Sequence, residues 1–214
     1  MNDGAETARC RGRLIVLAAP SGAGKTTLVR ALLQQNPDLR FSVSHTTRPK
    51  RRSEEQGRDY FFVDRARFET MVEAGDFLEH ARVFDNWYGT ERAHVQALLD
   101  AGHCVLLEID WQGAEQVRQK MPEAVSIFIM PPSRGELERR LRGRKTDSDA
   151  VIERRLADAL DDMSHWSEFD YLVINDDLKE AVAALGRLVA VDDPRFATAR
   201  PEVMARARKV LATG

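Results

Sequence analysis

Residues 17–27 read Leu-Ala-Ala-Pro-Ser-Gly-Ala-Gly-Lys-Thr-Thr. An apolar run at residues 14–17 precedes this stretch and predicts a buried strand, and leucines at positions 28, 32 and 33 follow it with helical spacing. A strand, a glycine-rich turn and a helix in this order form the phosphate-binding loop of many nucleotide-binding proteins. The stretch therefore predicts a nucleotide site at the end of the first strand.

The residue types in this stretch suit phosphate binding. Gly22 and Gly24 let the backbone curl so that several N–H groups point into one concavity, and the start of the helix adds partial positive charge there. Lys25 can reach the terminal phosphates, and the hydroxyl of Thr26 is placed to ligate Mg²⁺. The motif usually begins with glycine, whereas this chain has Ala19, which is tolerable if its φ is negative. A turn that only links strand and helix is the alternative.

The composition is that of an ordinary globular protein. Of the 214 residues, 43% are hydrophobic and 31% are charged, and this length suits one domain or one domain with lobes. The 32 basic and 34 acidic residues nearly cancel. Net charge therefore gives no reason to expect a nucleic acid or a membrane as partner.

Three features predict a cytoplasmic protein. Residues 1–13 are polar and lack the apolar segment of a secretory signal, and no stretch approaches the roughly 18 apolar residues of a spanning helix. The two cysteines, Cys10 and Cys104, lie far apart in the sequence. We expect both to be free thiols in a reducing compartment.

Strands and helices alternate along most of the chain. We expect strands at residues 13–19, 41–43, 59–63, 79–84, 87–88, 104–109, 125–130 and 171–174, and helices at residues 25–35, 65–74, 92–101, 113–120, 134–141, 150–166, 178–191 and 201–212. Five of the strands are apolar enough to be buried and are separated by helices. This pattern predicts an α/β fold, a doubly wound parallel sheet flanked by helices with its ligand at the carboxyl edge.

The run of strands between residues 41 and 90 interrupts the alternation, and we interpret it as a small inserted lobe. The charged segment 142–149 suits an exposed mobile loop, and both features are natural places for a second substrate and a moving lid. The predicted organisation is a disordered leader at 1–12, one domain at 13–190 and a tail helix at 191–214. Within the domain we expect a core at 13–40, 91–133 and 167–190, the lobe at 41–90 and the lid at 134–166.

A basic and aromatic cluster in the lobe predicts a second anion site. It comprises Arg48, Arg51, Tyr60 and Tyr88, whose guanidinium and phenol groups can surround a phosphate dianion with charge-assisted hydrogen bonds. A solvated basic loop is the alternative for the arginines alone. A phosphate loop with a second anion site favours a small-molecule kinase over a GTPase, which needs an Asn-Lys-x-Asp motif that this chain lacks.

Several acids and polar residues suit base and metal recognition. Glu79 lies in an apolar strand, where its carboxylate can accept from the N1–H and 2-amino groups of guanine while Ser44 and Thr90 donate to O6. An ordinary salt bridge is the alternative for Glu79. Glu108 and Asp110 end a buried strand, where an acid commonly orients Mg²⁺ through water or secures the loop hydroxyl.

Three arginines flank the charged loop or lie within it, namely Arg140, Arg144 and Arg155. Closure of a lid could bring them to the transferring phosphates, where they would neutralise charge on the equatorial oxygens. Surface arginines on amphipathic helices are the alternative. The five histidines show no spacing typical of a metal site.

Seven segments, in order along the chain, resemble bacterial guanylate kinases. They read Ser-Gly-Ala-Gly-Lys-Thr at 21–26, Ser-Val-Ser-His-Thr-Thr-Arg at 42–48, Gly-Arg-Asp-Tyr-Phe-Phe at 57–62, Phe-Leu-Glu-His at 77–80, Tyr-Gly-Thr at 88–90, Ile-Asp-Trp-Gln-Gly at 109–113 and Val-Ile-Asn-Asp-Asp at 173–177. The resemblance implies transfer of the ATP γ-phosphate to GMP, and by extension dGMP, in purine nucleotide metabolism. It also implies Mg²⁺ as cofactor and a P-loop NTPase core with a GMP-binding lobe and a helical lid.

The resemblance also implies the roles of individual residues. The implied ATP-binding residues are Ala19, Pro20, Ser21, Gly22, Ala23, Gly24, Lys25, Thr26, Thr27 and Asn175. The implied GMP contacts are Ser44, Glu79, Thr90 and Asp110 for the base, and Arg48, Arg51, Tyr60 and Tyr88 for the phosphate. The implied catalytic charges are Lys25, Arg48, Arg140, Arg144 and Arg155. Thr26 would hold Mg²⁺ directly, and Glu108 and Asp110 would hold it through water.

Five positions depart from the usual family pattern: Ala19, Ser53, Glu108 and Lys145 replace Gly, Gly, Asp and Gly, and Trp87 replaces Tyr. None of them removes a group that phosphoryl transfer needs. The expected partners are the small molecules ATP and GMP or dGMP, without nucleic acid or membrane, and the oligomeric state is left open. Two other functions also stay open, a non-catalytic module that binds phosphopeptides through the arginine cluster and a nucleoside monophosphate kinase with another base preference. The intact Gly24-Lys25-Thr26 sequence favours an enzyme.

Overall fold

The computed structural model describes residues 12–83, 85–143 and 149–212. The chain forms two compact parts. We call residues 19–39 together with the chain from 127 onward the loop part, and residues 12–18 with 40–126 the lobe part. None of the described helices has the length and apolar character needed to cross a membrane.

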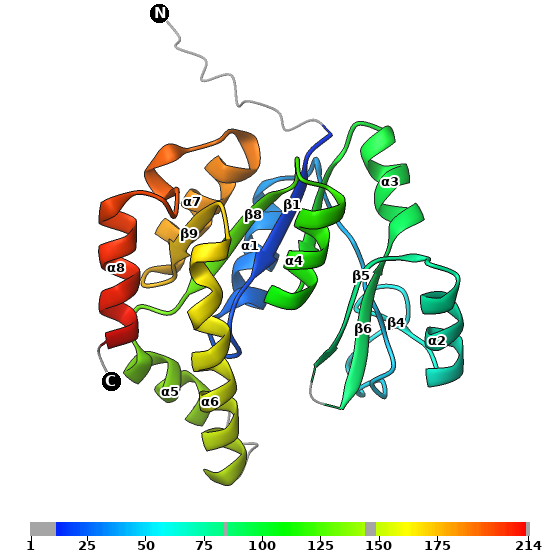
Figure 1. Ribbon diagram of the computed structural model, residues 1–214, viewed down its shortest axis with the longest axis horizontal. Helices are drawn as coiled ribbons and strands as arrows, with labels where there is room; N and C mark the ends of the chain where they lie inside the picture. The colour runs from blue at the N-terminus through cyan, green and yellow to red at the C-terminus, as the bar shows by residue number, and fades with distance from the viewer. Residues whose placement is uncertain (1–11, 84, 144–148, 213–214) are drawn as a thin grey trace, which may run out of the picture. The chain divides into compact units, whose positions relative to one another are not determined.

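The loop part contains two parallel strands and most of the helices (Figure 1). Its elements are α1 (Lys25–Gln35), β8 (Val125–Met130), α5 (Arg134–Arg142), α6 (Asp149–Ser164), η1 (His165–Glu168), β9 (Tyr171–Ile174), α7 (Leu178–Ala190), η2 (Pro194–Phe196) and α8 (Pro201–Ala212). β8 and β9 pair in parallel. Every residue of β8 is buried, as expected for an apolar strand of a parallel sheet. α7 packs against both α1 and β9, and α5 packs against α6.

The lobe part contains strands of two sheets. Its elements are β1 (Leu14–Ala18), β2 (Leu39–Phe41), β3 (His45–Thr46), β4 (Phe61–Phe62), α2 (Arg65–Glu73), β5 (Phe77–Val83), β6 (Asn86–Glu91), α3 (Arg92–Asp100), β7 (Cys104–Glu108) and α4 (Trp111–Lys120). β7 lies between β2 and β1 and pairs in parallel with β1. The second sheet has the order β4-β3-β6-β5, in which β5 and β6 are antiparallel.

A small apolar core holds α2 onto the second sheet. Phe68 of α2 stacks on Phe77 of β5 with ring centroids 4.6 Å apart, and Met71 is buried beside them. Trp87 of β6 packs against the same cluster. Because this core grips β5 and β6, it fixes the strands that carry Glu79, Tyr88 and Thr90.

The predicted α/β fold with parallel strands and flanking helices is confirmed, and α1, β8, β9 and α8 have the predicted bounds. The prediction missed β3, because two residues are too few to show a strand period. It also missed η2, which lies between the helices expected at 178–191 and 201–212. The division into core, lobe and lid stays a prediction.

Cys104 is disulfide-bonded, so the expectation of a free thiol is wrong for this residue. Its side chain is fully buried at the start of β7. Separation along the chain was a poor guide here, because it does not limit how close two side chains lie in space. Cys10 lies outside the described residues.

Candidate active site

The phosphate loop joins β1 to α1 and depends on two glycines. Gly22 and Gly24 have φ values of 90° and 91°, in the left-handed region that favours glycine. A Cβ on Gly24 would lie 2.6 Å from Nδ2 of Asn175. Gly24 is the N-cap of α1 and, being glycine, supplies no capping side chain. The first N–H groups of α1 are therefore suited to an anion.

Asn175 and Arg140 hold the loop from elsewhere in the loop part. Nδ2 of Asn175 donates to the carbonyl oxygen of Ala23 at 2.7 Å, and Nη1 of Arg140 donates to the same oxygen at 3.1 Å. Nη2 of Arg140 also donates to the main-chain oxygen of Asn175 at 3.1 Å. Asn175, assigned to the ATP site, and Arg140, assigned as a catalytic charge, thus both contact the backbone of the phosphate loop.

Glu136 orients Arg140, and the sequence analysis missed it. Its carboxylate accepts from Nε of Arg140 at 2.7 Å and from both Nε and Nη2 of Arg139. These hydrogen bonds, that of Arg139 foremost, lower the pKa of Glu136 to about 2. Ser133 caps α5 by accepting from the Glu136 N–H. The spacing of four residues between Glu136 and Arg140 was the available signal.

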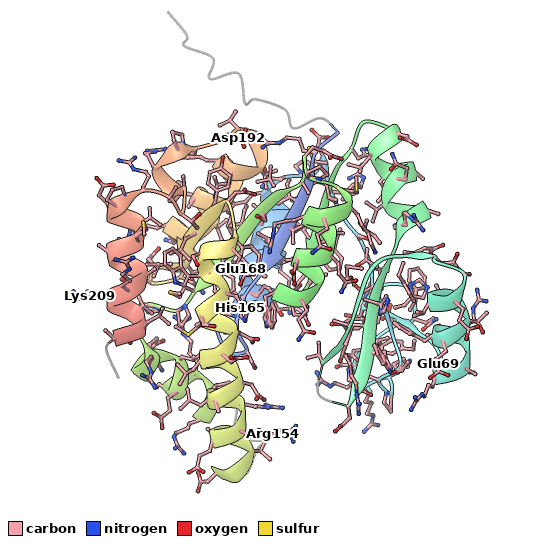
Figure 2. All side chains as sticks on the ribbon, viewed as in Figure 1. Glu69, Arg154, His165, Glu168, Asp192 and Lys209 are labelled. Carbon is pink, nitrogen blue, oxygen red and sulfur yellow. The ribbon has the colours of Figure 1, made fainter. Side chains whose placement is uncertain are left out.

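Several other residues assigned to ATP binding or to catalysis lie on α1 and α6. Lys25 is half-buried and Thr26 is exposed in the first turn of α1. Arg155 is half-buried on α6, and its neighbour Arg154, labelled in Figure 2, is exposed. Arg144 lies outside the described residues. The roles of all these side chains stay predictions.

The structure brings three of the four predicted phosphate-binding side chains together in the lobe part. Cζ of Arg48 lies 5.4 Å from the ring centroid of Tyr60, and the rings of Tyr60 and Tyr88 are 5.9 Å apart. Burial, together with the charge of Glu108, raises the pKa of Tyr60 to about 12. This phenol is therefore a hydrogen-bond donor at neutral pH. Arg51, the fourth residue, is exposed.

Glu54 is a second residue that the sequence analysis missed. Its two carboxylate oxygens accept from Nη2 and Nη1 of Arg48 at 2.7 and 3.1 Å, and it also accepts from the Arg51 N–H at 2.8 Å. The hydrogen bond from Glu54 is the main cause that raises the pKa of Arg48. Glu54 therefore aims the guanidinium group that is predicted to capture phosphate. An acid three residues after Arg51 was the only sequence signal.

The predicted guanine contacts also gather in the lobe part. Glu79 is 3% exposed, and its carboxylate accepts from Oγ1 of Thr90 at 2.5 Å, across the β5–β6 pair. Burial foremost, with the nearby charge of Asp110, raises the pKa of Glu79 to about 7. Among the described residues its hydrogen-bond partner is a hydroxyl and not a basic side chain. The salt-bridge alternative is thus not what this part of the structure shows.

Asp110 and Gly113 complete this site at the start of α4. Oδ1 of Asp110 accepts from the Gly113 N–H at 2.7 Å and caps the helix. A Cβ on Gly113 would lie only 2.6 Å from Oε2 of Glu79, so a side chain there would displace the carboxylate. Ser44 and Glu108 are half-buried in the same part. Gly113 was noted only as part of the segment 109–113, because its role depends on contact between α4 and β5.

The residues around the phosphate loop lie in the loop part, and those predicted to bind GMP lie in the lobe part. We call these two groups the ATP half-site and the GMP half-site. Residues 11–191 match the family model described as guanylate kinase. The chain belongs to the guanylate kinase family. A guanylate kinase from Chromohalobacter salexigens is 55% identical over 202 residues, which cover 94% of this chain and 92% of the relative. One from Alkalilimnicola ehrlichii is 54% identical over 200 residues, covering 94% and 98%.

A solved structure agrees with these guanylate kinase relatives. The crystal structure of guanylate kinase from Anaplasma phagocytophilum superposes with a TM-score of 0.71 at 36% identity, covering 86% of this chain and 87% of that one. The resemblance that rested on seven short segments is thereby confirmed for the family and the fold. The assignment of single residues in this guanylate kinase-family protein stays a prediction.

Proposed function

We propose that this protein transfers the γ-phosphate of ATP to GMP, giving ADP and GDP, with the residue roles set out below. The buried contact between Glu79 and Thr90 carries the proposal, because it holds a carboxylate in an apolar setting where it suits the N1–H and 2-amino donors of guanine. Membership of the guanylate kinase family supports it. We propose dGMP as a second acceptor, since none of the assigned contacts requires the ribose 2′-OH.

Base selection follows from the hydrogen-bonding groups of Glu79 and Thr90. An ionised Glu79 accepts from the N1–H and 2-amino groups of guanine, and Ser44 is assigned as a donor to O6. Thr90 has one hydroxyl proton, which it gives to Glu79 in this structure, so Thr90 would donate to O6 only by turning away from that carboxylate. Adenine has an acceptor at N1 and no 2-amino group, so it would offer the buried carboxylate no donor at either position and would leave it with the Thr90 hydroxyl. Such a mismatch costs about 1–3 kcal/mol, which corresponds to a discrimination of roughly tenfold to a hundredfold.

The acceptor phosphate is captured by Arg48, Tyr60 and Tyr88, with Glu54 holding the guanidinium of Arg48 in place. A phosphate monoester has a second pKa of about 6, so its nucleophilic oxygen is already ionised at neutral pH. No general base is therefore required. The protein has instead to orient the phosphate and neutralise its charge.

The donor phosphates are held by the N–H groups at the start of α1 and by Lys25, while Arg140 and Arg155 are assigned to charge neutralisation. Among the described residues no three acidic, histidine or cysteine side chains form a metal site. This fits Mg²⁺, which binds mostly to substrate phosphates and water with few protein ligands. Thr26 would hold the ion directly and Glu108 and Asp110 through water. When bound, Mg²⁺ neutralises charge on the phosphates.

We propose the cytoplasm as the working compartment, because ATP and GMP are the proposed substrates. The disulfide at Cys104 makes this testable, since disulfides are uncommon in the cytoplasm. Thiols would be alkylated during cell lysis and counted by mass spectrometry. Two alkylated cysteines per chain would show that this disulfide is not formed inside the cell and would support the proposal, whereas none would argue for an oxidising compartment.

Steady-state assays with ATP and each of GMP, dGMP, AMP, UMP and CMP test the activity. We expect turnover with GMP and dGMP and less than about a tenth of that kcat/KM with the others. Lys25→Ala should abolish turnover while the circular dichroism spectrum stays unchanged. Turnover of AMP equal to that of GMP would contradict the base-reading role of Glu79. No turnover with any acceptor would favour the non-catalytic module.

A further inference from the structure

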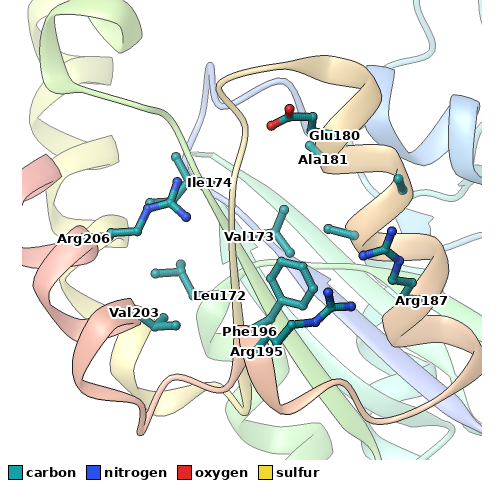
Figure 3. Close-up of a pocket in the computed structure, with 12 residues that line it drawn as sticks. Leu172, Val173, Ile174, Glu180, Ala181, Arg187, Arg195, Phe196, Val203 and Arg206 are labelled. Atoms are coloured by element: carbon teal, nitrogen blue, oxygen red, sulfur yellow. The ribbon is translucent and has the colours of Figure 1, made fainter.

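A pocket in the loop part lies apart from every residue assigned to ATP or GMP. It has a volume of about 350 Å³ and is lined by β9, α7, η2 and α8 (Figure 3). This volume is within the range of sites for small organic ligands, roughly 300–1,000 Å³. Two of its walls, η2 and α8, lie beyond residue 191, where the match to the family model ends.

The C-terminal tail is docked firmly enough to form a wall. The Thr198 N–H donates to the carbonyl oxygen of Asp170 at 2.9 Å, and Ala207 and Val210 of α8 are buried. β9 pairs with β8 along its length, whereas on its other side the described chain shows only the bridge between Tyr171 and Ala197. The tail therefore does not extend the sheet, and it leaves a hollow beside the rest of β9.

The floor of the pocket is apolar and its rim is basic. Leu172, Val173, Phe196 and Val203 supply apolar surface. Three arginines come from three different elements, Arg187 from α7, Arg195 from η2 and Arg206 from α8. In Figure 3 the guanidinium groups of Arg206 and Arg187 lie at opposite sides of the pocket, with Val173 and Phe196 between them.

The three arginines are not equally available. Arg195 is paired with Asp193 at 2.5 Å, and Arg187 acts on the same carboxylate through its charge. Arg206 has no hydrogen bond or ion pair with any described residue, although Glu180 also lines the pocket. The rim thus carries more positive than negative charge, and Arg206 on α8 is the arginine whose charge is least neutralised by an acidic neighbour.

We propose that this pocket binds a small organic dianion whose two anionic groups stand at opposite ends of an apolar body. Arg206 pairs with one end and Arg187, beside the Arg195–Asp193 pair, with the other. The apolar body lies on the surface of β9 and Phe196. Carboxylate and phosphate groups both match a guanidinium fork, so either can form an end.

Terephthalate is a suitable probe because it has a carboxylate at each end of a benzene ring. The full-length ¹⁵N-labelled protein would be titrated and the amide signals of Leu172, Val173 and Phe196 followed. We expect saturable shifts at these amides, with benzoate at least tenfold weaker and benzyl alcohol weaker still. Equal affinity for terephthalate and benzoate, or no saturable shift at these amides, would overturn the proposal. 4-Carboxyphenyl phosphate, which has a carboxylate at one end and a phosphate at the other and is close to a trianion at neutral pH, serves as a second probe, and binding tighter than that of terephthalate would identify phosphate as the preferred end group.

A pair of variants on one helix separates specific pairing from general charge. Arg206→Gln should weaken terephthalate binding at least tenfold, to the level of benzoate with the unchanged protein. Arg208→Gln should leave it unchanged, because Arg208 is exposed on α8 and does not line the pocket. Arg187→Gln provides a second test if Arg206→Gln fails to fold. The pairing would be refuted if Arg206→Gln and Arg208→Gln lost the same affinity for terephthalate. It would also be refuted if Arg206→Gln or Arg187→Gln bound terephthalate as tightly as the unchanged protein. The measurement is of binding alone, so its outcome is independent of GMP phosphorylation.

Discussion

Asn175→Ala tests whether a side chain remote in sequence shapes the phosphate loop. The Asn175 side chain is buried and donates to Ala23 at 2.7 Å, across 152 residues of sequence. Its removal does not leave the Ala23 oxygen unpaired, because Arg140 still donates to it at 3.1 Å. The expected loss of unfolding free energy is therefore that of one net hydrogen bond, about 1 kcal/mol, and not the larger cost of an orphaned buried group.

The expected effect of Asn175→Ala on catalysis is larger than its effect on stability would suggest. For a chain of this size 1 kcal/mol lowers Tm by about 2–4 °C, which leaves the protein folded at 25 °C. A loosened loop no longer holds its N–H groups ready for the phosphates, so kcat/KM for ATP should fall about tenfold. Differential scanning calorimetry and initial-rate kinetics with varied ATP measure the two effects separately.

Asn36→Ala is the matched control. Nδ2 of Asn36 donates to the carbonyl oxygen of Leu32 at 2.7 Å, at the end of α1 and away from the phosphate loop. This variant should lose a similar amount of stability and keep the kinetics of the unchanged protein. The reasoning is refuted if Asn175→Ala retains its kcat/KM for ATP, or if Asn36→Ala lowers it equally.

Three further predictions concern the GMP half-site. Arg48→Ala should raise the KM for GMP at least tenfold, measured from initial rates with varied GMP. Arg58→Ala is the control, because it removes an exposed arginine that is paired with Asp59, and it should leave this KM unchanged. Gly113→Ala should raise the KM for GMP about tenfold, because the added Cβ would meet Glu79. Gly186→Ala is the control, since Gly186 has open space around it. It should leave the kinetics unchanged and stabilise α7 by up to about 1 kcal/mol, measured in a thermal melt. The pKa of Glu79 is raised to about 7, so its carboxylate forms as pH rises through 7, and GMP should bind more tightly there. Because burial favours the neutral carboxyl in the folded protein, the free energy of unfolding should decline between about pH 4.5 and 7 and then level off. Glu79→Gln should remove the Glu79 component of both pH dependences, and an unchanged stability profile between these pH values would contradict the raised pKa.

The sequence was most informative where structure depends on near neighbours. The strand, glycine turn and helix around Lys25 were predictable because glycine conformation and helix periodicity are local properties. The cap of α5 by Ser133 was predictable for the same reason. The apolar strands β8 and β9 were found with their correct bounds because burial on both faces leaves a continuous apolar run.

Residue types with suitable chemistry were also recognisable in advance, but their partners were not. Arg48, Tyr60 and Tyr88 were chosen as anion ligands, yet the role of Glu54 depends on side-chain direction within an irregular loop. Glu79 was chosen for guanine, and its approach to Gly113 depends on how α4 packs on β5. The disulfide of Cys104 escaped detection because distance along a chain says little about distance in space.

What the amino-acid order alone settles here is the set of local elements, the family and the chemical character of both half-sites. Folding decides which of those groups meet: Asn175 with Ala23, Glu79 with Thr90, and the arginines of α7, η2 and α8 around one hollow. The physical reason is that hydrogen bonding, burial and charge pairing act over a few ångströms in space. Residues that are far apart in the chain come within that range only after the strands have paired and the helices have packed.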